Sequence, residues 1–223
     1  MNSPFDDYQM KLTMSARFPM KGEELEHIQT IYAEIFRYVG DSDRREICGR
    51  LLGYFINMEQ MFNDGENFLI YLDDHSKGLS ETIQLFNSDE NEKTGCLKPA
   101  TQKALNLEYP FYTYDNFIYI ERLEIAHKHR GKGLGMHFFN QALTYLARVL
   151  RFDFYALKPF PLQSESARKE KLNDKWQKRL DLDKLGKNFD KSLKKLCSLY
   201  ADLGFEKVRG TNFMVCQSYY FRK

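Results

Sequence analysis

The sequence predicts an α/β fold, in which helices pack on a mixed sheet, and three observations support this prediction. Two strand-like segments, residues 28–38 and 46–57, flank a polar turn and fit a β-hairpin. The segment 116–159 then reads as a strand, a loop with glycines, an amphipathic helix and a second strand. A further amphipathic helix is expected over residues 191–205. Strands that alternate with helices in this way are typical of α/β proteins.

The bulk composition is that of one folded domain. The chain has 223 residues, of which 43% are hydrophobic and 15% aromatic, so it can bury a core and is not globally disordered. The net charge of +2 is too small to indicate, by itself, binding to nucleic acid or to an anionic membrane. We therefore predict a single domain over residues 1–223.

The cysteines and the N-terminus bear on metal sites and on localisation. None of the four cysteines stands in a CxxC pair, so neither a zinc ribbon nor a thioredoxin-like motif is present, and we expect no metal. The first residues lack the apolar region of a secretory signal, and no run approaches the ~20 apolar residues of a membrane span. A cytoplasmic protein without membrane contact is therefore expected.

The segments before the glycine loop are assigned from their composition. Residues 1–22 are polar and contain two prolines, which predicts a loose arm. Residues 25–39 fit a helical face or a strand, and their β-branched and aromatic content suits a hairpin of 28–38 with 46–57, which we prefer. A helical pattern follows over 66–86, and the mostly polar residues 87–110 predict a long connection.

The glycine loop lies between a strand expected over 116–125 and a helix expected over 133–150. Glycine permits positive φ and lets backbone N–H groups approach a ligand closely. N–H groups at a helix N-terminus bind anions, and the helix dipole strengthens this binding. The loop therefore predicts a phosphate site, formed by Arg130, Gly131, Lys132, Gly133, Leu134 and Gly135.

Three phosphate-binding motifs can be compared with this loop. The P-loop pattern GxxxxGK[ST] is absent. The dinucleotide pattern GxGxxG is not met, although Asp153 lies about 20 residues on, where such folds place an acid. The pattern [Q/R]xxGxG is met by Arg130, Gly133 and Gly135. A nucleotide or dinucleotide binder, and a purely structural turn, remain as alternatives.

Two segments of the sequence resemble the GNAT acyltransferases, which bind acetyl-CoA. LEIAHKHRGKGLGMHFFNQAL, residues 123–143, is similar to the family's strand 4, pyrophosphate loop and helix 3. LYADLGF, residues 199–205, is similar to the end of its helix 4. The two lie in the family's order with a strand between them, and the resemblance covers about 115–159 and 191–216. It implies a GNAT-like α/β (α+β) fold, with a mixed, mostly antiparallel twisted sheet flanked by helices.

The resemblance also implies a reaction and a cofactor. The expected enzyme is an N-acetyltransferase that moves an acetyl group from acetyl-CoA directly to an amine in a ternary complex and releases CoA. The pyrophosphate contacts would fall on residues 130–135. The pantetheine arm would pair with the backbone of Leu123, Glu124 and Ile125, between splayed strands. Tyr200 would donate a proton to the leaving thiolate.

The group that accepts the amine proton is predicted from the strand before the loop. Strict alternation would put Tyr119, Glu121, Leu123 and Ile125 on one face, with Glu124 on the other. In several GNAT enzymes such groups stand nine or eleven residues before the arginine of the loop, which here gives Glu121 and Tyr119. Glu121 is the first candidate and Glu124 the second. The alternative is that both are solvent-facing carboxylates paired with Arg122.

The charged insertion over residues 160–190 has no counterpart in most GNAT sequences, which pass from strand to helix within a few residues. It contains the chain's only tryptophan, Trp176. It could be a solvated, partly helical excursion, or a lid over the acceptor site. The expected acceptor is an amine on a small molecule, a peptide or a protein, and a basic edge that meets RNA is a weaker alternative. A CoA-binding module without catalysis also fits the resemblance.

Overall fold

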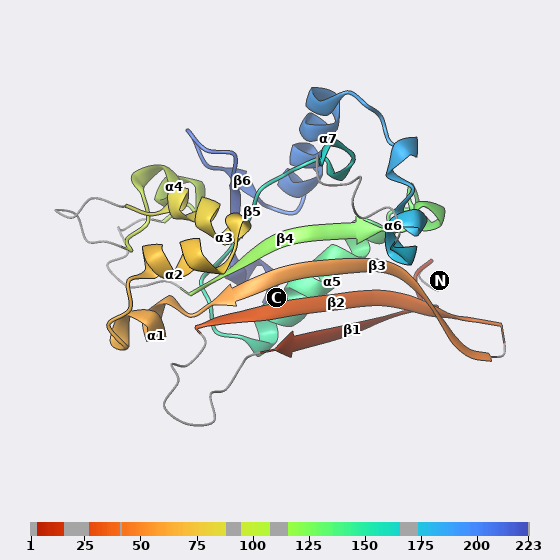
Figure 1. Cartoon of the computed structure of the whole chain (residues 1–223), viewed down its shortest axis with the longest axis horizontal. Helices are drawn as coiled ribbons and strands as arrows, with labels where there is room; N and C mark the ends of the chain where they lie inside the picture. Colours follow the sequence, from red (N-terminus) through yellow and green to blue (C-terminus); the bar gives the residue numbers. More distant parts are fainter. Residues whose placement is uncertain are drawn as a thin grey trace.

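The structure is a computed structural model, and the residues that it describes are 4–15, 27–40, 42–87, 95–107, 116–165 and 174–222. Within them, seven strands form one sheet in the order β1-β2-β3-β4-β5-β7-β6 (Figure 1). The strands are β1 (Tyr8–Ser15), β2 (Ile28–Val39), β3 (Ser42–Ile56), β4 (Phe117–Ile125), β5 (Phe154–Leu157), β6 (Glu206–Lys207) and β7 (Met214–Gln217). Among these described strands, only the pairing of β4 with β5 is parallel. The predicted mixed, mostly antiparallel sheet is confirmed.

The N-terminal half of the sheet is an antiparallel meander of β1 to β4. The predicted hairpin is confirmed, because β2 and β3 pair from Ile28↔Ile56 to Val39↔Ser42. The prediction of a loose arm is wrong for residues 8–15, which form the edge strand β1 along β2. Apolar residues alternate with polar ones in YQMKLTMS, and the apolar ones pack against the core while the polar ones are exposed. This period of two is typical of a half-buried strand.

Helices cover both faces of the sheet (Figure 1). On one face lie α1 (Met58–Asn63), α2 (Phe68–His75), α3 (Lys77–Thr82), the 3₁₀ turn Ile83–Leu85 and α4 (Pro99–Ala104). The helical pattern over 66–86 is divided because Ser76 is extended and caps α3, its hydroxyl accepting from the N–H of Leu79. The long connection predicted over 87–110 contains a short helix, α4, which begins at Pro99. Residues 88–94 and 108–110 of this connection lie outside the described residues.

The opposite face is covered by α5 (Leu134–Val149), and its apolar side forms the larger core with β2, β3 and β4. The buried residues of this helix are Leu134, Phe138, Phe139, Ala142, Leu143, Leu146 and Ala147. On the α1–α4 side, the rings of Phe117 and Phe154 stack with centroids 5.2 Å apart. The two cores hold the first four residues of β4 against β5. This end of β4 lies away from the glycine loop.

The chain between β5 and β6 contains α6 (Lys175–Leu180) and α7 (Phe189–Ala201), with 3₁₀ turns at Leu162–Ser164 and Leu182–Lys184. Further 3₁₀ turns lie at His127–His129 and Ser218–Phe221. Trp176, Leu180 and Leu182 are buried in a small core with Ala126. The described part of the insertion is therefore packed on the sheet and is not a solvated excursion. Among the described residues, no helix has the length and apolarity to cross a membrane.

Candidate active site

A bulge in β4 lies at the centre of the candidate site. The register with β3 passes from Leu52↔Arg122 to Gly53↔Ile120, so Glu121 is an extra residue of β4 without a partner in β3. A bulge of this kind re-aims side chains and increases the local twist of the strand. Every residue of β4 after Glu121 therefore faces the opposite way from strict alternation.

The bulge overturns the predicted faces of β4. Leu123 and Ile125 pack on the α5 side, with Ile118 and Ile120. Tyr119 packs on the α1–α4 side, and Glu121 points to the same side. The prediction that Glu121 shares a face with Leu123 and Ile125 is wrong. One inserted residue moves every later side chain of the strand to the opposite face.

β4 and β5 part at the bulge. Their parallel pairing runs from Phe117↔Phe154 to Ile120↔Leu157, whereas β4 continues to Ile125 along β3. In the described part of the chain, the edge of residues 121–125 that faces β5 has no strand partner. An extended ligand could add to this edge by main-chain hydrogen bonds. The arrangement agrees with the splayed strands that the GNAT resemblance implies.

The glycines of the loop serve different purposes. Gly131 and Gly133 have φ of 75° and 80°, and Gly133 is the N-cap residue of α5. A Cβ would meet nothing within 4 Å at Gly131 and only Phe5 at 3.7 Å at Gly133. Glycine is therefore favoured at these two positions by the positive φ angle and not by steric crowding. A Cβ on Gly135 would lie 3.1 Å from Ile125, so this glycine lets the helix approach β4 closely. The three residues 131–133 are exposed at the helix N-terminus, where an anion can bind.

Arg130 brings a cation to the base of the loop. Its Nε donates a hydrogen bond of 2.8 Å to the carbonyl oxygen of Ile125. Its Nη1 is buried and has no hydrogen-bond partner in the described chain, and burial lowers the pKa of the guanidinium. Buried donors are usually paired. A phosphate oxygen would satisfy Nη1, so the loop fits a ligand that bears phosphate groups.

Tyr200 lies on α7, whose apolar side is only partly covered. No residue of this helix is fully buried, although its apolar residues lie on one side. The Tyr200 ring packs edge-on against Phe139 at 5.6 Å, on the α5 side of the sheet. Burial raises the pKa of Tyr200 to about 12. Its hydroxyl makes no hydrogen bond within the described residues, so it can serve a ligand.

Glu121 lies on the other side of the sheet, against α3. Its carboxylate accepts a hydrogen bond of 3.1 Å from the hydroxyl of Tyr54. Gly78 of α3 is so close that a Cβ there would lie 3.1 Å from the carboxylate. Burial, and then the charge of Glu121, raise the pKa of Tyr54 to about 12, so Tyr54 remains a donor at neutral pH. Tyr54 and Gly78 were not predicted as site residues, because only the fold brings them to β4.

Glu124 has a different environment from Glu121. It is 6% exposed and accepts hydrogen bonds from the indole of Trp176 at 2.6 Å and from Arg122 at 3.2 Å. Arg122 also binds Glu165 at 2.6 Å. The carboxylate of Glu124 therefore links the insertion to β4 through its hydrogen bond with Trp176. Arg122 pairs with Glu124 and Glu165, whereas Glu121 accepts its hydrogen bond from Tyr54.

Asp153, the acid that a dinucleotide site would require, lies far from the loop. Its N–H donates to the carbonyl oxygen of Asn116 at 2.9 Å, just before β4 begins. The loop follows the other end of β4, a strand of nine residues and about 30 Å. Asp153 therefore cannot bind the ribose of a nucleotide whose phosphates occupy the loop.

Comparisons with known proteins complete the description. No family model matches the chain, and no curated protein matches it. Solved structures align at a TM-score of 0.40. A Tyr-to-Phe mutant of KacT is 10% identical, over 86% of this chain and 73% of that one. The KacTA–DNA complex is 8% identical over 95% and 96%. A Tyr-to-Phe mutant of the toxin AtaT, bound to the C-terminus of the antitoxin AtaR and acetyl-CoA, is 9% identical over 97% and 96%.

Proposed function

We propose that the protein is an N-acetyltransferase that transfers an acetyl group from acetyl-CoA directly to an amine acceptor. One observation carries this proposal: β4 and β5 part before a glycine loop with two positive φ angles, and an amphipathic helix whose apolar side is only partly covered bears Tyr200. The opening suits an extended arm, and the loop suits a diphosphate. A ligand that occupies both the opening and the loop must carry an extended arm and a diphosphate, as CoA does.

The residues of the chain have distinct roles in this reaction. Arg130 and the loop amides hold the pyrophosphate, and the edge of β4 pairs with the pantetheine arm. The amine nitrogen attacks the thioester carbon, and Glu121 accepts the proton that the amine loses. A backbone N–H of β4 near Ile125 stabilises the oxyanion. The carbon–sulfur bond then breaks, and Tyr200 donates its proton to the thiolate of CoA.

The donor site is tested first, by thermal unfolding of the full chain with acetyl-CoA, CoA, NADH or no ligand. A ligand at 100 times its dissociation constant stabilises a protein by about 2.7 kcal/mol, which raises its melting temperature measurably. We expect stabilisation by acetyl-CoA and CoA and none by NADH. Gly133→Glu should abolish it, since a carboxylate on the loop repels phosphate. Gly210→Glu is the matched control, because Gly210 also has φ of 80° and open space around it.

The acceptor is then sought by following release of the CoA thiol with panels of amines. Turnover with an amine supports the enzyme. Binding of acetyl-CoA without turnover of any small amine, peptide or protein would favour a CoA-binding module. Stabilisation by NADH alone would favour a nucleotide-binding protein and overturn the proposal.

A further inference from the structure

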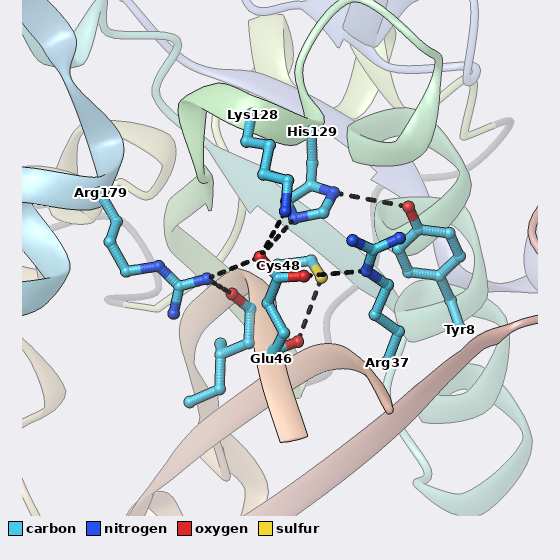
Figure 2. A network of polar contacts seen from close by, with 8 residues as sticks. Tyr8, Arg37, Glu46, Cys48, Lys128, His129 and Arg179 are labelled. Atoms are coloured by element: carbon cyan, nitrogen blue, oxygen red, sulfur yellow. Dashed lines mark hydrogen bonds and ion pairs between the residues drawn. The ribbon is translucent and has the colours of Figure 1, made fainter. Parts of the chain in front are cut away.

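Three side chains with metal-binding atoms meet where β3 passes the start of the glycine loop (Figure 2). Glu46 and Cys48 come from β3, and His129 comes from the 3₁₀ turn that follows β4. One atom from each residue, a carboxylate oxygen, the thiol sulfur and an imidazole nitrogen, lies within 4.8 Å of the other two. Cys48 is fully buried, His129 is 3% exposed and the side chain of Glu46 is 18% exposed, so the cluster is largely shielded from solvent.

The fold brings these residues together by a second irregularity in the sheet. The pairing of β2 with β3 passes from Phe36↔Ile47 to Ile35↔Gly49, which leaves Cys48 as an extra residue. The carbonyl oxygen of Cys48 accepts a hydrogen bond of 2.9 Å from Ala126, at the entrance to the 3₁₀ turn. The bulge and this bond together fix Cys48 beside His129.

The imidazole of His129 has an unsatisfied nitrogen aimed into this cluster. Its Nε2 is buried and has no hydrogen-bond partner among the described residues, and the oxygen of Glu46 that faces it lies at 3.5 Å. That separation exceeds the 2.7–3.2 Å typical of N–H···O hydrogen bonds. The other nitrogen, Nδ1, lies 3.5 Å from the hydroxyl of Tyr8. Buried polar atoms are normally satisfied, so Nε2 points to a missing partner.

We propose that Glu46, Cys48 and His129 form a binding site for a zinc ion. Thiolate, imidazole and carboxylate are the ligands that zinc takes in proteins, and three of them leave one position open. Sequence patterns do not predict the site, because its ligands follow no metal-binding spacing and are separated by some eighty residues of chain. The inference concerns metal binding alone and does not depend on the proposed acyltransferase.

The charges around Glu46 bear on this site. Arg37 binds the second carboxylate oxygen, Oε2, at 2.9 Å, and leaves Oε1 on the side of His129 (Figure 2). Lys128 and Arg179 approach Oε1 at 3.3 and 3.8 Å, and their side chains are 68% and 39% exposed. Lys128 can turn into solvent when an ion binds, whereas Arg179 also donates to the carbonyl oxygen of Ile47 and lies over the ring of Trp176, so it would remain beside the site. Arg37 would remain and orient the carboxylate, as groups behind metal ligands commonly do.

The test uses the full chain after treatment with a chelator and dialysis. Zinc is titrated into it calorimetrically, and bound metal is counted after gel filtration. Cobalt is added in a parallel sample, since a cobalt–thiolate bond gives a charge-transfer absorption that carboxylate and imidazole alone do not give. We expect one equivalent of zinc, a higher melting temperature with zinc than with chelator, and the thiolate absorption with cobalt.

Two variants and two controls assign the ligands. Cys48→Ala and His129→Gln should each weaken zinc binding at least about tenfold, and Cys48→Ala should remove the cobalt–thiolate absorption. Cys197→Ser and His127→Gln change the same residue types outside the cluster and should bind as the wild type does. Circular dichroism in chelator checks that the variants fold, and a variant that fails to fold leaves the other to decide. Absence of stoichiometric zinc from the wild type, or wild-type affinity in both folded variants, would overturn the proposal.

Discussion

The indole Nε1 of Trp176 donates a hydrogen bond of 2.6 Å to the carboxylate of Glu124, and this bond joins the insertion to β4. The guanidinium of Arg50 lies over the same indole, 4.4 Å from its centre. Trp176 therefore holds in place the segment of β4 whose free edge is proposed to bind pantetheine. The insertion supports the donor site from the side of the sheet opposite α5.

The first prediction concerns this bond. Trp176→Phe keeps an aromatic ring under Arg50 but removes the donor to Glu124. Hydrogen bonds to charged groups are worth about 1.5–3 kcal/mol, so we expect a loss of that size in the free energy of unfolding. Urea denaturation followed by circular dichroism measures it, because the variant has no tryptophan fluorescence. In a double-mutant cycle with Glu124→Gln, additive losses would show that the two side chains do not interact.

The fold could be predicted where periodicity is strong. Two parts of the fold lie where the sequence predicts them. The spacing of apolar residues predicts the hairpin of β2 and β3, and this spacing together with the glycines predicts the unit from β4 to β5. Residues 8–15 alternate as a half-buried strand does, but the polar composition and the two prolines of residues 1–22 favoured a loop. The segment 99–104 was missed because a helix of six residues is too short to show a period.

The candidate site could be predicted in its backbone but not in its side-chain faces. The loop glycines and Arg130 lie at a helix N-terminus, as their spacing indicates. The direction of Glu121 could not be predicted, since a bulge depends on the partner strand and has no local signature here. Tyr54 and Gly78 reach Glu121 only through tertiary packing. Trp176 was noticed as the chain's only tryptophan and Glu124 as a candidate base, but the hydrogen bond between them could not be predicted.

The second prediction concerns the proton acceptor. Glu121→Gln keeps the size of the side chain and can still accept from Tyr54, but it cannot take the proton of an amine. General base catalysis contributes typically 10²–10⁴-fold, so kcat should fall by about that factor and its pH profile should change. Acetyl-CoA binding should be unchanged. Steady-state kinetics and thermal shift measure the two effects.

Glu206→Gln is the control for this change, because Glu206 is an exposed carboxylate on β6. Its activity should match that of the wild type. Activity retained in Glu121→Gln would refute the role of Glu121. A loss of acetyl-CoA binding as large as the loss of turnover would indicate that Glu121 supports the structure of β4 instead.

The third prediction concerns stability at alkaline pH. Burial raises the folded-state pKa of both Tyr54 and Tyr200 to about 12, whereas a tyrosine in the unfolded chain has a pKa of about 10. Above pH ~10 the unfolded state therefore binds fewer protons, so the free energy of unfolding falls as pH rises. The contribution of these hydroxyls is complete below pH ~10 and is lost towards pH ~12. Urea denaturation between these limits measures the slope, and stability independent of pH there would contradict the prediction.

The fourth prediction concerns Tyr200 as the proton donor. Tyr200→Phe keeps the packing of the ring against Phe139 and removes a hydroxyl that makes no hydrogen bond within the described chain. Stability should therefore change little, while kcat falls by about 10²-fold or more. Because the pKa of Tyr200 is about 12, the wild-type donor is protonated across neutral pH. Tyr145→Phe, at an exposed tyrosine on α5, is the control. Unchanged turnover in Tyr200→Phe, with acetyl-CoA still bound, would require the thiolate to leave without this proton, or to receive one from water.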